Sequence, residues 1–203
     1  YNCTGRVNTV TPKIIKLLKA SGCVSIYYGL ESGNQKILQT MSKKTTLDQI
    51  YEAVRLTREA DIYCAYGLMF GQPGEDEQTL RDSVELIKKI SYGEYRTNKV
   101  FGCVPFPGSG LYDWCKQKGL IKSDKDFYDT YLNQHWSLDQ IPINMTDLTH
   151  QEAERLFRNA QEELSGFFQE KMAQDWVKYF GGSSDQLLNG HGNHKTMGHI
   201  RNR

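Results

Sequence analysis

The sequence predicts an α/β fold, a fragment of a parallel (β/α) TIM-type barrel followed by a long helix. Nearly continuous apolar runs alternate with amphipathic segments, and several of the apolar runs end in glycine-rich turns. This alternation is typical of buried parallel strands that are covered by helices. Because crossovers between parallel strands are right-handed, the C-terminal ends of the strands should meet at one rim. Residues that follow the strands are therefore expected to converge there.

Composition narrows the functional classes. The chain has 203 residues, 38% of them hydrophobic, and a net charge of +1 with no basic stripe, so nucleic acid is not an expected partner. No apolar run approaches the roughly 18 residues that a membrane span needs. The five cysteines are dispersed and form no metal-binding pair, which indicates a reducing, cytoplasmic compartment. The chain starts on Tyr1 in a strand-like run, so we expect a piece of a longer protein.

The fold is expected to be organised around Val24–Gly33. The first part of this stretch is β-branched and aromatic, which favours a strand. Gly29 and Gly33 permit a sharp turn and a close ligand approach, and Glu31 and Ser32 lie between them. An acid and a hydroxyl at the end of a strand are typical of sites in α/β folds. The alternative is that Ser32 caps the next helix and Glu31 is solvated.

The other elements are predicted in order along the chain. Apolar runs indicate further strands over residues 1–7, 62–70 and 99–104. Caps and helical spacing predict helices over residues 11–21, 34–41, 45–60 and 111–117, and one around Leu80, Val84 and Ile87. The turn over residues 71–74 offers backbone groups that could contact the edge of a base, and an ordinary tight turn is the alternative. The same two possibilities apply to residues 105–110.

The C-terminal part has a different character. Residues 122–145 are polar and aromatic without a clear period and are expected to form an irregular connection. Its aromatic side chains either contribute to a substrate site or pack against the long helix. A capping box at Thr149–Glu152 begins that helix, which should run to about Tyr179. We therefore divide the chain into residues 1–120, the barrel part, residues 121–180, the connection and long helix, and residues 181–203, a tail that should be disordered.

The ordered set of motifs resembles a known family. Gly29–Gly33, Lys43, Phe70–Glu75 and Pro107–Ser109 follow one another as in the second half of the core of radical S-adenosylmethionine (SAM) enzymes. The resemblance is closest to the subgroup that often carries a cobalamin-binding domain before the barrel. It covers about residues 1–120.

The resemblance implies a SAM site at the strand ends. Glu31 would hydrogen-bond SAM and Lys43 would approach its carboxylate, while the backbone from Gly67 to Gly71 would flank the adenine and Val104–Pro105 would close the far side. The implied cofactor-binding residues are Arg6, Glu31, Ser32, Lys43, Gly67, Met69, Gly71, Val104 and Pro105. In the intact protein a four-iron iron–sulfur cluster would cleave SAM to a 5′-deoxyadenosyl radical, which would abstract hydrogen from a small-molecule or other substrate or drive methyl transfer through cobalamin.

One departure from the family is large. Its Cys-x3-Cys-x2-Cys cluster motif is missing, because the nearest cysteines in the sequence, Cys103 and Cys115, are twelve positions apart. We therefore expect a C-terminal fragment that holds no metal ligand and is inactive alone. The partners would be a missing N-terminal barrel half and, in some members, a cobalamin domain. The alternatives are a non-catalytic barrel relative that acts as a binding module, and a half-barrel enzyme that binds a phosphate or sugar.

Overall fold

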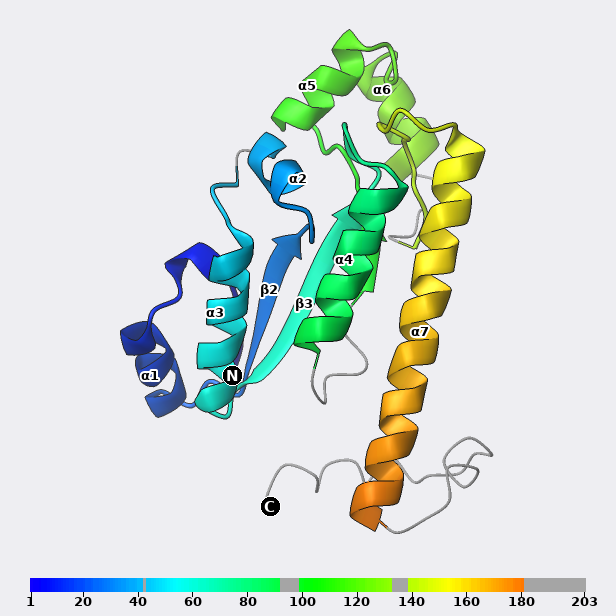
Figure 1. Cartoon of the computed structure of the whole chain (residues 1–203). Coiled ribbons are helices and arrows are strands. Elements are labelled where there is room, and N and C mark those ends of the chain that lie inside the picture. The colour runs from blue at the N-terminus through cyan, green and yellow to red at the C-terminus, as the bar shows by residue number, and fades with distance from the viewer. Residues whose placement is uncertain (42, 92–98, 133–138, 181–203) are drawn as a thin grey trace.

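The structure, a computed structural model, describes residues 1–41, 43–91, 99–132 and 139–180. The predicted disordered tail lies outside these residues. Four parallel strands form one sheet in the order of the chain. They are β1 (Asn2–Gly5), β2 (Ser25–Glu31), β3 (Tyr63–Phe70) and β4 (Lys99–Gly102). The predicted parallel α/β architecture is therefore confirmed (Figure 1).

Helices connect the strands and cover the sheet. The connecting elements are the 3-10 helix η1 (Val7–Thr9), α1 (Pro12–Ala20), α2 (Gln35–Thr40), α3 (Leu47–Glu59) and α4 (Glu77–Ile90). Beyond β4 the chain forms α5 (Gly110–Gln117), α6 (Asp124–Phe127), the π-helical turn η2 (Tyr128–Leu132) and α7 (His150–Phe180). Figure 1 shows α2 and α5 beyond the arrowheads of the strands, and α7 running alongside α4.

The main core lies between the sheet and its helices. Along β2 every second side chain is buried, and Ile26, Tyr28 and Leu30 are at most 1% exposed. Full burial of an apolar side chain contributes about 1.5–3 kcal/mol to folding, so this alternation fixes which face of β2 meets the helices. The intervening positions, among them Tyr27 and Gly29, point to the opposite face of the sheet.

The long C-terminal helix forms as predicted. Its capping box is present, since the Thr149 hydroxyl accepts the Glu152 N–H (3.3 Å) and the Glu152 carboxylate accepts the Thr149 N–H (3.0 Å). One stripe of the helix is buried: Ala153, Leu156, Phe157, Ala160, Leu164 and Phe168. Phe157 lies against Phe70 of β3 with ring centroids 6.4 Å apart. The apolar stripe therefore attaches α7 to the sheet.

The prediction of an irregular connection over residues 122–145 is wrong in its first part. Ser123 caps α6, and Phe127 is buried against Tyr112 of α5, with ring centroids 5.1 Å apart. A single short turn leaves no period to detect, which is why the sequence pattern missed it. Phe127 also belongs to a second, smaller core with Tyr112 and Cys115, rather than to the face of the long helix.

The edge of the sheet at β1 leads to a prediction about solubility. Among the described residues β1 pairs only with β2, so one side of its backbone is unpaired. An open edge favours association with another strand. We expect residues 1–203, expressed alone, to associate in light scattering coupled to gel filtration, and Thr4→Lys to reduce the association by placing a charge on the edge. A monodisperse monomer that unfolds cooperatively would contradict this expectation.

Candidate functional site

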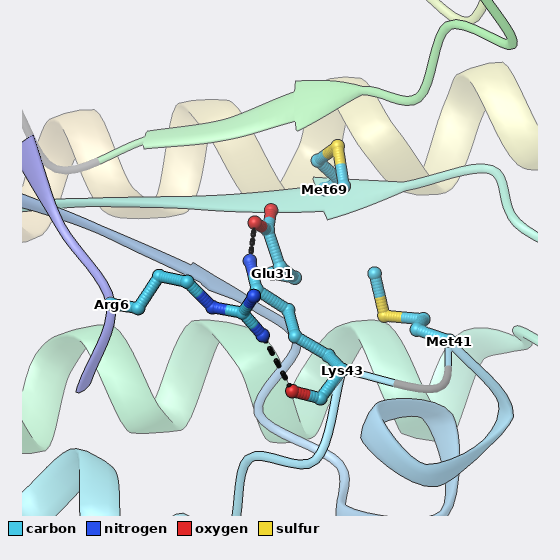
Figure 2. A pocket seen from close by; sticks show the side chains of 5 residues that line it. All are labelled: Arg6, Glu31, Met41, Lys43 and Met69. Atoms are coloured by element: carbon cyan, nitrogen blue, oxygen red, sulfur yellow. Dashed lines mark hydrogen bonds and ion pairs between the residues drawn. The ribbon is translucent and has the colours of Figure 1, made fainter. Parts of the chain in front are cut away.

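The C-terminal ends of β1, β2 and β3 surround a cavity of about 420 Å³. Its lining residues are Arg6, Glu31, Met41, Lys43 and Met69 (Figure 2). Cavities of roughly 300–1,000 Å³ are usual for small-molecule sites. The predicted convergence of strand ends therefore holds for Arg6 and Glu31, whereas the segments 71–74 and 105–110 do not line this cavity. Lys43 and Met69, which the family resemblance had placed at the site, line it as well.

Glu31 reaches the cavity because the end of β2 is distorted. Gly29 pairs with Gly67, whereas Glu31 pairs with Leu68, so the register shifts by one residue between them. Such a bulge redirects the following side chain. Glu31 also has a φ of 71°, which is uncommon for a residue with a side chain. Strained backbone of this kind gathers at functional sites.

Gly29 is needed for the same arrangement. A Cβ atom at this position would lie 2.8 Å from Oε1 of Glu31 and 3.4 Å from Nζ of Lys43. The absent side chain thus leaves the space in which the carboxylate and the ammonium meet. This gives a physical reason for the Gly-Leu-Glu order at the end of the strand.

The charged groups in the cavity form one network. Nζ of Lys43 makes an ion pair with Oε1 of Glu31 and donates to the Gly29 carbonyl (3.1 Å). Nη2 of Arg6 donates to the Lys43 carbonyl (2.8 Å), which ties the loop after α2 to the end of β1. The side chains of Lys43 and Glu31 are each 18% exposed, so the alternative of a solvated Glu31 is wrong.

Electrostatics in the cavity favour an anionic group on a ligand. Burial, and next the Arg6 guanidinium, lower the pKa of Lys43 to about 8. The lining holds two cationic side chains and one carboxylate. Such a set matches a ligand that carries both a carboxylate and an ammonium group, since each finds an oppositely charged partner.

Two methionines complete the lining. Met69 points into the cavity from β3, and Met41 approaches it from the loop after α2 (Figure 2). Thioether side chains are flexible and polarisable, and they pack well against aromatic rings. Met41 was not among the predicted site residues. Its place two positions before Lys43 was the available signal.

Ser32 lies outside the cavity lining. It is fully buried, and its hydroxyl accepts the Asn34 N–H (3.1 Å). Asn34, not Ser32, caps α2, because its side-chain oxygen accepts the Lys36 and Ile37 N–H groups (3.0 and 3.3 Å). The alternative role of Ser32 as the cap is therefore wrong as well, and Ser32 shapes the turn below the cavity.

The turn after Ser32 is fixed by α4. The Gly33 N–H donates to the Ser83 hydroxyl (2.8 Å), and the Asn34 amide donates to the Asp82 carboxylate (2.6 Å). Helix α4 thus holds the segment that directly follows Glu31.

Other predicted residues do not line the cavity. Gly67 lies on β3 under the Tyr27 ring, whose hydroxyl oxygen would be 1.9 Å from a Cβ there. Val104 packs against the second core beyond β4, and the neighbouring Pro105 is buried. None of these residues contributes to the lining of the described cavity.

The turn that begins at Gly71 does not present free backbone groups as expected. The Gly71 and Gln72 N–H groups both donate to Oε2 of Glu75 (2.9 Å each), and the Gly71 carbonyl accepts the Met145 N–H (3.1 Å). Glu75 is folded back into the turn and only 2% exposed, and Asp76 alone caps α4. The possibility that these two N–H groups contact the edge of a base is therefore removed.

Glu75 makes stability depend on pH. Burial raises the pKa of its carboxyl from 4.5 to about 8, against the effect of the two N–H donors. The unfolded chain loses this proton near pH 4.5 and the folded chain only near pH 8, so the free energy of unfolding should fall as pH rises between these values. Glu75→Gln should remove most of this fall in urea titrations at pH 5 and pH 8. The exposed Glu77→Gln is the control, and an equally steep fall in Glu75→Gln would contradict the assignment.

Two kinds of feature were searched for in the described residues. No group of three or more His, Cys, Asp or Glu side chains there is placed to hold a metal ion. In the same residues, none of the helices is long and apolar enough to cross a bilayer.

Comparison with known proteins agrees with the fold. Residues 1–87 match the sequence model of the Radical SAM superfamily. An uncharacterized methyltransferase of Pyrococcus horikoshii is 26% identical over 123 residues, which are 60% of this chain and 26% of the relative. A tRNA-2-methylthio-N(6)-dimethylallyladenosine synthase of Rickettsia prowazekii is 28% identical over 129 residues, again 60% of this chain and 26% of the relative. The chain thus spans about a quarter of these relatives.

Solved structures share the fold at low sequence identity. Coproporphyrinogen III oxidase of Escherichia coli, described as a radical SAM enzyme, superposes with a TM-score of 0.57 at 12% identity, covering 82% of this chain and 32% of that one. A radical SAM methyltransferase of Kitasatospora setae, solved with tryptophan and a SAM analogue, superposes with a TM-score of 0.51 at 20% identity, covering 58% of this chain and 22% of that one.

Proposed function

We propose, from the premise that residues 1–87 belong to the radical SAM superfamily, that the cavity at Glu31 and Lys43 binds SAM. The observation that carries this proposal is the pairing of a carboxylate with two cationic side chains in one cavity. The carboxylate of SAM would meet Lys43 and Arg6, and its ammonium or ribose hydroxyls would meet Glu31. The ligand's adenine would pack beside Met69.

The ion pair between Glu31 and Lys43 leaves capacity for such a ligand. A carboxylate offers about four acceptor positions and an ammonium three donors. The Lys43 ammonium donates to the Glu31 carboxylate and to the Gly29 carbonyl oxygen. The two side chains thus hold each other in position while retaining sites for SAM. The SAM analogue in the Kitasatospora setae enzyme supports a SAM site on this fold.

The proposed reaction belongs to the whole protein. With a reduced four-iron cluster, SAM supplies a 5′-deoxyadenosyl radical for hydrogen abstraction or, together with cobalamin, a methyl group. The described residues do not fit a cluster, because they contain no suitable group of cysteines. The cluster ligands and any cobalamin domain would lie in other parts of a cytoplasmic protein. The share assigned to this chain is to hold SAM through Arg6, Glu31 and Lys43.

Calorimetric titration under anaerobic conditions tests the proposal. The protein that contains this chain is titrated with SAM and, separately, with a set of sugar phosphates. We expect heat of binding with SAM and none with the sugar phosphates. Binding of a sugar phosphate alone would instead support a half-barrel enzyme of another class.

A second candidate is a non-catalytic barrel relative that acts as a binding module. The observation that favours it is the lack of a Cys-x3-Cys-x2-Cys motif in the 203 residues. Anaerobic reconstitution of the same protein, followed by iron and sulfide analysis, separates the candidates. About four irons per polypeptide support the enzyme, and an iron-free protein that also fails to bind SAM supports the module.

A further inference from the structure

We propose that Cys3 and Cys23 form a reversible disulfide, a modification site distinct from the SAM cavity. Their sulfur atoms are 3.8 Å apart, although the residues are far apart in sequence. Cys3 belongs to β1, and Cys23 lies in the turn between α1 and β2. All five cysteines are reduced in this structure.

The backbone around the pair is already held together. The Val24 N–H donates to the Tyr1 carbonyl (2.9 Å), and Asn2 pairs with Ser25 in the sheet. A disulfide needs sulfur atoms about 2.05 Å apart and Cα atoms within about 7 Å. Within the sheet Cys3 lies opposite Ile26, three residues after Cys23. Closing the sulfur separation of 3.8 Å therefore relies on rotation of both side chains and on movement of the turn that carries Cys23, while the strand pairing stays as it is.

The two thiols differ in accessibility, which sets the order of the reaction. Cys3 is partly exposed, whereas Cys23 is 1% exposed. Burial, and next the neighbouring Cys23, raise the pKa of the Cys3 thiol, so its thiolate is scarce at neutral pH and the reaction accelerates in alkaline solution. Cys3 therefore meets a small oxidant first, and Cys23 follows.

The step is a thiol–disulfide exchange with a small disulfide such as oxidised glutathione. The Cys3 thiolate attacks one sulfur of the oxidant, a mixed disulfide forms, and one glutathione thiolate leaves. The Cys23 thiolate then attacks Sγ of Cys3, and the second glutathione thiolate leaves. Two protein thiols are oxidised, one glutathione disulfide is reduced to two thiols, and the protons of the two cysteines end on glutathione.

The bond would constrain the edge of the sheet near the cavity. It would close a loop that contains α1 and Arg6, and Arg6 follows Cys3 by three residues. Cross-linking restricts the unfolded chain. Oxidation should therefore raise the melting temperature and slow amide hydrogen exchange in β1.

Peptide mapping tests the proposal in the protein that contains this chain. The native protein is treated with oxidised glutathione at pH 8.5, remaining thiols are alkylated, and trypsin then cleaves after Arg6 and Lys19, which separates the two cysteines. We expect a linked peptide pair two hydrogens lighter than the sum of its reduced parts. Cys115→Ser is the control and should give the same pair. Cys23→Ser should instead leave Cys3 carrying glutathione.

Three outcomes would overturn the proposal. They are a stable glutathione adduct on Cys3 of the wild-type protein, a bond to another cysteine, and unmodified Cys3 and Cys23. The same treatment in urea measures which disulfides form in the unfolded chain. The proposal requires a larger yield of the Cys3–Cys23 bond in the native protein than in that sample.

Discussion

Replacing Glu31 by alanine is expected to weaken SAM binding by roughly 10- to 150-fold. A hydrogen bond to a charged group contributes about 1.5–3 kcal/mol, and each 1.4 kcal/mol is about tenfold in affinity. The substitution also removes the ion-pair partner of Lys43. In addition, the alanine must adopt the φ of 71° that Glu31 has, and its side chain forms no hydrogen bond there. Glu31→Gln keeps the shape and one acceptor, so its loss should be smaller. Lys43→Ala should weaken binding as well, because it removes one of the two cationic side chains that line the cavity.

Equilibrium binding of SAM to the reconstituted variants measures this order. Lys44→Gln is a matched control, because it removes a neighbouring charge on an exposed side chain outside the cavity lining. The iron content should be the same in all variants, since Glu31 is not a cluster ligand in the proposal. Unchanged affinity in both Glu31 variants would remove this residue from the site.

Gly33→Ala is expected to destabilise the fold by about 1–3 kcal/mol, the usual cost of overpacking. A Cβ atom there would lie 2.4 Å from the Asp82 carbonyl oxygen and 2.6 Å from the Ser83 Cα. Both atoms belong to the backbone of α4, so no side-chain rotation relieves the overlap. Either the turn after Glu31 or the helix must move, and the hydrogen bond from Gly33 to Ser83 is stretched in both cases.

Urea denaturation compares this variant with Gly166→Ala in the middle of α7. A Cβ at Gly166 meets no atom within 4 Å, and alanine is the better helix former, so this control should stabilise by about 0.5–1 kcal/mol. If the change in the free energy of unfolding has opposite signs at the two positions, the loss at Gly33 is due to the close contact and not to a general effect of replacing glycine. A wild-type unfolding midpoint for Gly33→Ala would contradict the packing described for this turn.

Much of the fold was predictable from sequence because the signals are local. The strand predicted from Val24 is β2, displaced by one residue, since a β-branched and aromatic run between glycines has few alternatives. The convergence of Arg6 and Glu31 followed from the handedness of parallel crossovers. Neither inference required knowledge of distant contacts.

The features that were missed depend on contacts between distant segments or on single turns. Glu75 was expected at a helix N-terminus, and only the fold of its own turn buries it under two backbone N–H groups. The ion pair of Glu31 with Lys43 needs a bulge in β2, which no pattern in the sequence indicated. The cap of α2 was uncertain because Ser32 and Asn34 are both good caps.

Gly102, at the end of β4, has the backbone of another segment against its face. A Cβ on this residue would fall 1.7 Å from the Gln140 carbonyl oxygen, so the segment that leads to α7 crosses β4 there in direct backbone contact. Because a Cβ points out of the plane of a sheet, this contact covers a face of β4 and not its hydrogen-bonding edge. Among the described residues β4 pairs only with β3, so the sheet has two unlike unpaired edges, β1 and β4. Contact between unlike edges adds copies without closing, so self-assembly of the isolated chain should continue beyond the dimer.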